Sequence, residues 1–402
     1  MRHALQQPAE FQARILSDND ADLFALAAGA GASVFQSSRF VSAIAAHVAS
    51  ADAQLVFVGV TDASGVPVAL FTFVARRRFG LAMLEALDFG LSDYFAPILL
   101  RPTPLNATQS DALWQAVLKV VPGAHAVAFK KLPRQLYGES HALSGAAFLK
   151  PMGASATTLR LTPTNQGNRF PVDRMSVARD VRRKTRKLEQ LGKLQLTQAT
   201  TQDEVDSFLQ TLVAMRRARF AELGRSDALL DDSIVAFYRD LASPGERTPV
   251  GRIFALHAGT TIVAVVYGFC VDGVFTLIAI AIATDKDLQA GSPGLVALYN
   301  TLEWCVRHDY RVFDLSVGSM HYKARFDAEQ VELFEYQQAL SPLGLIIVAE
   351  AALRRTVRHL ALKAPQFRHQ VEQLTAWYSK LKTSLGVLAG PLATLAPLGA
   401  SI

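Results

Sequence analysis

One order of predicted elements occurs twice in the chain, and this repeat limits the possible folds more than any other feature of the sequence. Segments 55–129 and 252–315 each predict three strands joined by short turns, then a helix, then one further strand. The pair Asp272–Gly273 is typical of a two-residue hairpin turn. We therefore interpret the chain as an internal duplication of an antiparallel meander followed by a helix and a strand.

The predicted elements are as follows. The first half contains a helix that begins at Ser37 or Ser38, strands at 55–60, 66–75, 81–89 and 125–132, and a helix at 106–121. The second half contains helices at 176–191, 202–223 and 295–308, strands at 252–258, 261–271, 274–284 and 311–317, and a short helical stretch at 322–326. These patterns predict the α/β class, with a mixed sheet of the α+β type.

A chain of 402 residues is longer than one hydrophobic core usually fills, so the sequence predicts more than one domain. The inferred boundaries are 1–165 for the first half, 166–340 for the second half and 341–402 for a helical, apolar extension. Hydrophobic residues make up 50% and charged residues 19% of the chain, which indicates a folded protein rather than a disordered one.

Missing motifs argue against several classes of enzyme. The sequence has no G-x-S-x-G turn, no H-E-x-x-H pattern and no P-loop, so hydrolase, metal-dependent or nucleotide-cleaving chemistry is not expected. Cys270 and Cys305 lie in apolar segments without C-x-x-C spacing, which predicts reduced thiols and no metal. The first residues lack a secretory signal, and Asp272 and Gly273 interrupt the apolar stretch 261–284, so we expect a cytoplasmic protein.

A net charge of +6 would attract a phosphate-bearing cofactor, a nucleic acid or an anionic membrane equally. Much of this charge lies in the helix 176–191, where Val181, Thr185 and Leu188 form one stripe and leave the basic residues on the other side. No aromatic residues interleave them, so we favour a solvated face over an RNA-binding one.

The turn from Gln289 to Gly294, QAGSPG, joins an apolar strand to an amphipathic helix and is rich in small residues. Backbone N–H groups at a helix N-terminus bind phosphate, and small residues allow a pyrophosphate to approach closely. Pro293 suits the first helical position. An ordinary connecting turn would have the same residues, so the context has to decide between the two interpretations.

That context is the segment FDLSVGSMHYK, which begins at Phe313 and matches the phrase FD-x-x-x-G-x-x-x-YK. Together with the basic helix ARDVRRKTRKLEQLGKL, the helix TLVAMRRARFAELG and the SPG turn, it resembles the CelD-type cellulose-biosynthesis branch of the GNAT acetyltransferase superfamily, which lies close to the FemAB peptidyltransferases. The resemblance spans about 35–340.

The resemblance implies tandem GNAT-like domains, a degenerate first one, and a C-terminal helical extension. It implies acyl-CoA, either acetyl-CoA or a longer one, as co-substrate, with no metal. The strand at 274–284 would present backbone amides to the thioester carbonyl as an oxyanion hole. The cofactor-binding residues would be Ile280, Ala281, Ile282, Gly291, Ser292, Pro293 and Gly294.

Direct acyl transfer needs a base for the acceptor and an acid for the CoA thiolate. Tyr322 is the candidate acid, although the spacing from the strand differs from that in related folds. His321 is one candidate base, and Asp93, in an SDY element similar to one in the same family, is the other. Asp314 is expected to orient the acid or the base.

The candidates for binding the acceptor are Arg217, Tyr94 and Lys323. Arg217 is selected from a cluster with Arg216 and Arg219, because the three arginines cannot all face one way on a helix. Tyr94 belongs to the SDY element, and Lys323 follows Tyr322 directly.

The extension 341–402 combines a basic amphipathic stretch with an uncharged tail. Packing on the domain or on a second copy in a homodimer would cover the tail, and peripheral contact with the inner membrane is the alternative. The interruption at Gly390 and Pro391 argues against a spanning helix.

The predicted function is therefore transfer of an acyl group from acyl-CoA to an amine or hydroxyl acceptor. By resemblance only, the acceptor is a small molecule, glycan or lipid of cell-envelope assembly. The alternatives are an aminoacyl-tRNA-dependent transferase, disfavoured because the usual coiled-coil insertion is absent, and a non-catalytic scaffold of a polysaccharide-synthesis complex.

Overall fold

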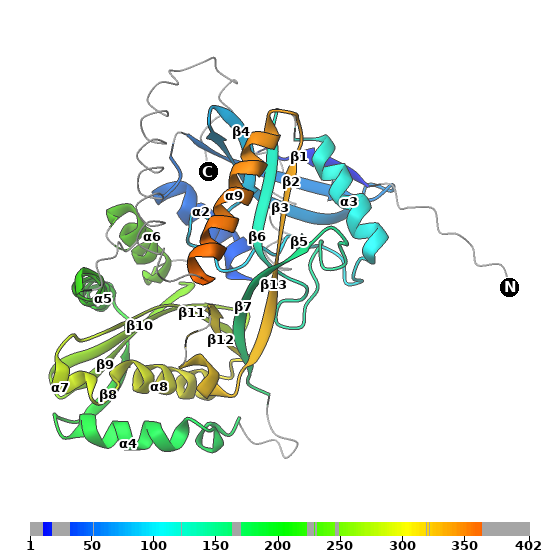
Figure 1. Cartoon of the computed structure of the whole chain (residues 1–402). Coiled ribbons are helices and arrows are strands. Elements are labelled where there is room, and N and C mark those ends of the chain that lie inside the picture. Colours follow the sequence, from blue (N-terminus) through cyan, green and yellow to red (C-terminus); the bar gives the residue numbers. More distant parts are fainter. Residues whose placement is uncertain are drawn as a thin grey trace.

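The computed structural model describes residues 11–17, 33–50, 52–121, 123–162, 170–222, 229, 231–245, 249–318, 320 and 322–363, without the side chains of 286 and 354–363. Its strands form one mixed sheet in the order β1-β2-β3-β4-β6-β13-β7-β12-β11-β10-β9-β8, and β5 pairs with β3 outside this order (Figure 1). The sheet therefore runs without interruption from the first half of the chain into the second.

The first half repeats the predicted order of elements. Its strands are β1 (Gln12–Ile15), β2 (Ala53–Thr61), β3 (Pro67–Arg78), β4 (Leu81–Ala86), β5 (Ile98–Leu99) and β6 (Ala126–Pro133), and its helices are α2 (Ser38–His47) and α3 (Ala107–Lys119). The side chain of Ser37 accepts a hydrogen bond from the Phe40 N–H and so caps α2. β4 and β6 are parallel, and the other strand pairs within this half are antiparallel.

The second half has the same plan. Its strands are β8 (Leu194–Gln198), β9 (Gly251–Ala258), β10 (Thr261–Val271), β11 (Val274–Ile282) and β12 (Val312–Val317), and its helices are α4 (Ala178–Glu189), α5 (Gln202–Glu222), α6 (Asp232–Ala242), α7 (Lys286–Gln289) and α8 (Pro293–Arg307). β11 and β12 are parallel, as β4 and β6 are. The predicted repeat of element order is confirmed.

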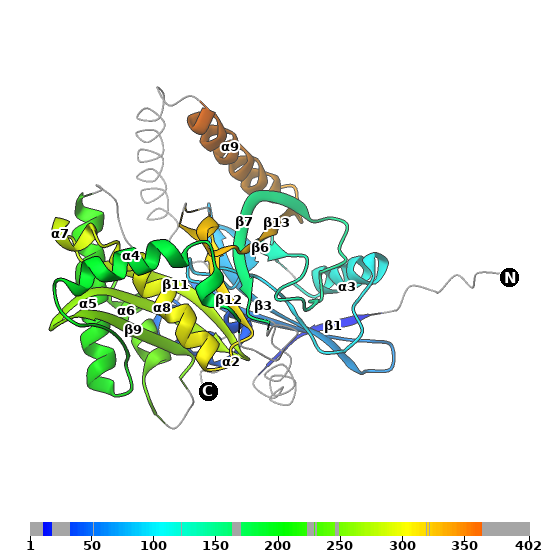
Figure 2. The same ribbon diagram turned by 90° about the horizontal axis from the view of Figure 1, so that it is seen from below.

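Helices cover both faces of the second half of the sheet. α4 and α8 pack on one face, and α5 and α6 pack on the other (Figures 1 and 2). The α5 face therefore belongs to a different core from the α8 face.

The Asp272–Gly273 hairpin has positive φ at both residues, 50° and 70°, as the predicted two-residue turn requires.

The two halves exchange their last strands. β7 (Lys150–Arg160) follows β6 in the chain, yet it pairs with β12 of the second half. β13 (Glu329–Ala339) follows β12, yet it pairs with β6 of the first half, and β7 and β13 pair with each other at the centre of the sheet. The boundary near residue 165 stays a prediction, because the sheet continues across it.

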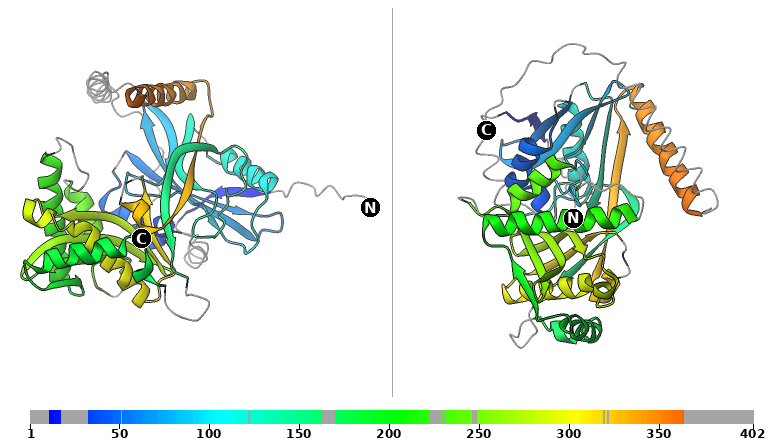
Figure 3. Two further views of the ribbon diagram at one scale, coloured as in Figure 1. Left: turned by 60° about the horizontal axis from the view of Figure 1, so that its bottom comes forward. Right: turned by 90° about the vertical axis from the view of Figure 1, so that its left-hand side faces the viewer.

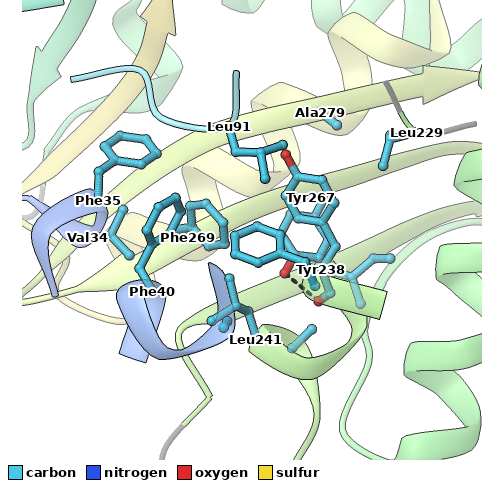
Figure 4. Close-up of a cluster of buried hydrophobic side chains, with 14 of the residues drawn as sticks. Val34, Phe35, Phe40, Leu91, Leu229, Tyr238, Leu241, Tyr267, Phe269 and Ala279 are labelled. Atoms are coloured by element: carbon cyan, nitrogen blue, oxygen red, sulfur yellow. Dashed lines mark hydrogen bonds between the residues drawn. The ribbon is translucent and has the colours of Figure 1, made fainter. Parts of the chain in front are cut away.

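An aromatic core also joins the halves (Figure 4). Phe40 of α2 meets Phe237 of α6 and Phe269 of β10 edge to face, with ring centroids 5.3 and 5.8 Å apart. Beside it, a guanidinium nitrogen of Arg39 donates to a carboxylate oxygen of Asp240 at 3.1 Å. The first half therefore packs against the α5 and α6 face of the second half.

The helix α9 (Gly344–Lys363) begins the extension and packs on β6 and β13, away from α4 (Figure 3). Its start is apolar and exposed at Leu345 and Ile346. No helix within the described part of the chain is long and apolar enough to cross a membrane. The uncharged tail with Gly390 and Pro391 lies outside the described residues, and the homodimer and peripheral membrane contact stay predictions.

The exchange of β7 and β13 predicts that the halves unfold together. Leu333 of β13 is fully buried, so Leu333→Ala should reduce the free energy of unfolding by about 2–5 kcal/mol. Fluorescence of Trp114 and Trp304, each followed in variants with the other tryptophans replaced by phenylalanine, reports the two halves separately. Both probes should shift to the same lower urea midpoint. The exposed neighbour Glu332→Ala serves as the control, and a shift in only one probe would contradict the prediction.

Candidate active site

β11 and β12 separate partway along their length. They pair in parallel only from Val274 opposite Val312 to Thr276 opposite Asp314. Beyond this point β11 stays paired with β10 up to Ile282, whereas β12 stays paired with β7. Because the backbone groups of a strand alternate between its two edges, every second N–H and C=O of β11 beyond Thr276 has no strand partner in the described chain.

A β-bulge lies next to the separation. Tyr267 of β10 is opposite Ala279 and Gly268 is opposite Leu277, so Ile278 is an extra residue in β11. Bulges bend a strand and re-aim its groups, and they are frequent beside active sites. The open edge of β11 therefore changes direction where β12 leaves it.

A cavity of about 310 Å³ lies along this open edge. Its walls come from the end of α5, from β11, from the start of α8 and from the segment after β12. The described residues that line it are Met215, Arg216, Arg219, Phe220, Ile280, Ala281, Ile282, Gly294, Leu295, Leu298, Met320 and Tyr322. The predicted strand residues Ile280, Ala281 and Ile282 and the turn residue Gly294 are thus brought together.

The turn before α8 satisfies most of its own N–H groups. Gly291 and Ser292 donate to the carbonyls of Leu288 and Gln289, and Leu295 donates to that of Ser292. Pro293 has no N–H, so within this turn the N–H of Gly294 is left without a backbone partner in the described chain. Within the described chain, the Gly294 N–H is therefore left for a group outside this turn.

Two contacts bring the turn close to its neighbours. A Cβ on Gly294 would lie 2.9 Å from Cγ2 of Ile282, so only glycine lets α8 approach β11 this closely. The Lys184 ammonium of α4 donates to the Ala290 carbonyl at 3.2 Å, which places a positive charge beside the turn. A cation and a helix N-terminus together favour an anionic group here.

A buried carboxylate lies at the point where β11 and β12 separate. Asp314 accepts hydrogen bonds from the hydroxyls of Tyr94 at 3.0 Å and Tyr137 at 2.7 Å, and from the Ser316 N–H at 2.7 Å. Burial raises the pKa of Asp314 to about 7, against the effect of these three donors. Asp314 therefore orients two tyrosines of the first half, and Tyr322 is not among its partners in the described chain.

Asp93 lies beside this carboxylate. The Ser316 hydroxyl donates to Asp93, and Ser316 has a positive φ of 67°, which is unusual for serine. Burial raises the pKa of Asp93 as well, while Lys131 and Lys323 act against the rise. The predicted base candidate Asp93 is thus held on β12 through a residue in a strained conformation.

The predicted acceptor-binding residues Lys323 and Tyr94 are both buried. The Lys323 ammonium donates to the carbonyls of Ser316 at 3.1 Å and Val317 at 2.9 Å. Burial lowers the pKa of Lys323. Tyr94 is only 1% exposed, so this predicted acceptor-binding residue positions Asp314 from below the surface. Both residues support the site rather than line it.

The remaining candidates lie in different surroundings. Tyr322 lines the cavity, and burial raises the pKa of its hydroxyl, which therefore stays protonated at neutral pH. Arg217 is exposed and is not among the lining residues, whereas Arg216 and Arg219 are. His321 lies outside the described residues. Among the predicted acids and acceptor residues, the structure brings Tyr322 to the cavity wall.

The corresponding place in the first half is filled by its own chain. After β4, the Leu87 N–H donates to the Thr72 carbonyl of β3, and the Phe95 N–H donates to the Lys131 carbonyl of β6. β5 then pairs with β3, and α3 begins only at Ala107. The SDY element lies in this crossing segment, so the first half uses it to contact the second.

Tyr137 was not predicted as a site residue. It lies in an irregular segment between β6 and β7, with a positive φ of 57°, and its hydroxyl also lies 3.3 Å from the Thr276 hydroxyl. No periodic pattern marks it, because its role arises only when β7 crosses to the second half. In the sequence, Tyr137 is marked only as a tyrosine in a polar connecting segment.

Comparisons with known proteins agree with this geometry. Residues 175–324 match the family described as Acetyltransferase (GNAT) domain. This match identifies a GNAT acetyltransferase domain in the second half and confirms that part of the predicted resemblance, whereas the CelD-like branch stays a prediction. No curated protein matches the sequence.

Solved structures show a similar fold. FemX is similar over 84% of this chain and 99% of its own length, with 9% identity and a TM-score of 0.53. The C-terminal domain of a putative lysylphosphatidylglycerol synthetase from Agrobacterium fabrum covers 83% and 96%, with 14% identity and a TM-score of 0.49. A tandem GNAT protein from the clavulanic acid biosynthesis pathway covers 82% and 98%, with 11% identity and a TM-score of 0.42. The likeness to FemX supports the fold over 84% of this chain.

The raised pKa of Asp314 predicts a pH-dependent difference in stability. Between about pH 4 and 7 the folded protein keeps a proton that the unfolded chain releases, so the free energy of unfolding falls as pH rises. Asp314→Asn removes this titration, and its stability relative to wild type should rise from pH 4 to pH 8 by up to roughly 4 kcal/mol. Urea midpoints at several pH values measure this.

Asp62 provides the control for this measurement. Its pKa is lowered, chiefly by the Ser64 hydroxyl, so Asp62→Asn should lose stability relative to wild type only above the acid range. A difference between Asp314→Asn and wild type that stays constant with pH would show that folding does not raise the pKa of Asp314.

Proposed function

We propose that this chain is an acyl-CoA-dependent acyltransferase that acts on an amine or hydroxyl acceptor. The observation that carries the proposal is the cavity beside the open edge of β11, within the segment that matches the GNAT acetyltransferase family. An open strand edge offers N–H donors to an extended ligand, and a cavity beside it excludes water.

The residues at the two ends of the cavity fit a coenzyme A thioester. At one end, the free N–H of Gly294, the start of α8 and the nearby Lys184 ammonium suit phosphate groups. Along β11, the unpaired N–H and C=O groups suit the amide groups of the pantetheine arm. Tyr322 lines the same cavity, and in our proposal its hydroxyl reaches the sulfur of the bound thioester.

The reaction would be direct transfer. The acceptor nitrogen or oxygen attacks the thioester carbonyl, and the open N–H groups of β11 beside the bulge stabilise the oxyanion. The C–S bond then breaks, and Tyr322 gives its proton to the departing thiolate. We assign to Asp93 the proton that the acceptor loses, because burial raises its pKa towards the working pH.

The buried cluster would act by positioning. Tyr94 and Tyr137 hold Asp314, Ser316 connects Asp314 to Asp93, and Lys323 fixes the end of β12. These bonds prevent Asp93 from rotating freely. His321 is the alternative base, and the pH profile described below separates the two.

The acceptor is proposed from the family resemblance alone. A glycan or lipid of cell-envelope assembly is the acceptor class that the CelD-like branch implies. Two alternatives stay open to the same measurements: a transferase that uses aminoacyl-tRNA, and a scaffold without catalytic activity. The basic face of α4 would be needed by the first alternative and not by the second.

Calorimetric titration with acetyl-CoA and octanoyl-CoA tests the proposal. Wild type should bind at least one of them, and Gly294→Trp should abolish binding because the new side chain has to enter the cavity or displace Ile282. Met320→Trp is a second blocking variant on a residue that is 58% exposed, so its folding should be unaffected. We expect at least a tenfold rise in Kd for Met320→Trp, equivalent to about 1.4 kcal/mol.

Val66→Trp is the matched control, because Val66 is an exposed residue of a hairpin in the first half. Its Kd should equal that of wild type. If wild type binds neither thioester, the acyl-CoA proposal is wrong, and charged tRNA becomes the next ligand to titrate.

The assigned acid and base predict separable kinetic effects. Tyr322→Phe should lower kcat by about 10²-fold without changing acyl-CoA affinity, because one proton donor is lost. Asp93→Asn should lower kcat similarly and should also remove the acidic limb of the kcat/KM profile, which lies above the ordinary aspartate range in wild type. If the acidic limb persists in Asp93→Asn, another group is the base, and His321 is the first candidate.

A further inference from the structure

The cavity at β11 extends to both faces of the sheet. Gly294, Leu295 and Leu298 belong to the α8 side, whereas Met215 and Phe220 belong to α5 on the opposite side. Residues from the two faces can line one cavity only where the sheet is open, which is the gap left by the separation of β12 from β11. The cavity therefore has a part on the α5 side of the sheet, which we call the α5 compartment.

We propose that the α5 compartment binds an alkyl chain of several carbons, carried by one of the two substrates. This rests on the proposed function and specifies its substrate class. The compartment walls are the side chains of Met215 and Phe220, with Ala281 of β11 between the two sides. A two-carbon acyl group would end at the strand edge and would leave these apolar walls in contact with water.

The charged residues of the cavity support this assignment. Arg216 lies over the Phe220 ring at 5.0 Å, and Arg219 donates to Glu222 at 3.1 Å, so both guanidinium groups are engaged within the protein. Among the described lining residues there is no aspartate or glutamate. A buried ammonium would have no counter-charge here, which favours a neutral chain with its head group outside the compartment.

The lining of the compartment is also adaptable. Methionine side chains fill irregular space and adjust to chains of different length. Met215 comes from α5 and Met320 from the segment after β12, so two such side chains reach the cavity from separate elements. The chain would therefore gain contacts with each added methylene until the compartment is full.

Calorimetry with acetyl-, butanoyl-, hexanoyl- and octanoyl-CoA tests the donor as the source of the chain. Each added CH₂ should lower Kd by roughly three- to fourfold up to the length that fills the compartment, as expected for burying a methylene. Met215→Trp should remove this length dependence, because the larger side chain would fill the compartment. Ala221→Trp is the control, because Ala221 is exposed near the same end of α5 and does not line the cavity.

A second series tests the acceptor as the source. Ethanol, 1-butanol and 1-hexanol are titrated into protein saturated with coenzyme A, and affinity should rise with length and be lost in Met215→Trp. A length dependence in either series that Met215→Trp removes supports the proposal and identifies the source. Two flat series, or a length dependence that Met215→Trp leaves intact, would overturn it.

The two titration series distinguish a wrong alkyl-chain compartment from a wrong acyl-CoA donor. If acetyl-CoA binds as well as octanoyl-CoA and the alcohols show no length dependence, the acyltransferase proposal stands and the alkyl-chain compartment is wrong. If no thioester binds but the alcohols do with the predicted dependence on Met215, the compartment stands and the acyl-CoA donor is wrong.

Discussion

The exchange of β7 and β13 between the halves is the constraint on which the rest of the structure depends. Both strands are interior, and each has neighbours on two edges, both of them from the other half of the chain. If one half folded alone, it would expose an unpaired strand edge, and such edges favour pairing with other chains. The shared sheet also sets the position of β12 relative to the SDY segment, and so it creates the seam where Asp93 and Asp314 meet.

Burial of the polar cluster at this seam costs free energy unless its hydrogen bonds are formed, so the cluster constrains how the two halves are placed. A buried carboxylate without donors would cost several kcal/mol, and Asp314 has three donors, two of them tyrosines from the other half. Any shift of one half against the other along the sheet would break these bonds. The contacts of Phe40 with Phe237 and Phe269 bury apolar surface between the halves, whereas the hydrogen bonds of Asp314 fix the position of one half relative to the other. The same bonds hold Asp93 beside the opening between β11 and β12.

Local signals in the sequence predicted the elements better than their partners. The serine before α2, the Asp272–Gly273 turn and the meander of β9 to β11 are properties of neighbouring residues, and all three are confirmed. β7, β13, β8 and α6 were not predicted, and the exchange of strands depends on pairing across more than a hundred residues, which no local pattern encodes. Gly294 and Tyr322, which the sequence singled out, both line the cavity beside β11, and their roles stay predictions. Tyr137 and Ser316 acquire their roles only through tertiary contacts.

The two halves differ at the place where the second half has the cavity beside β11. In each half two parallel strands lie at the same place in the order, and a helix connects them. In the second half the chain passes from β11 through residues 283–292, which include α7, into α8, with Gly294 at the contact with β11, and the strand edge stays open. In the first half the chain crosses the corresponding place before α3, and its backbone bonds to β3 and β6 close it. The crossing segment then delivers Asp93 and Tyr94 to the open half. The first half, in which this place is closed, thus supplies the residues that hydrogen-bond to β12 of the second half.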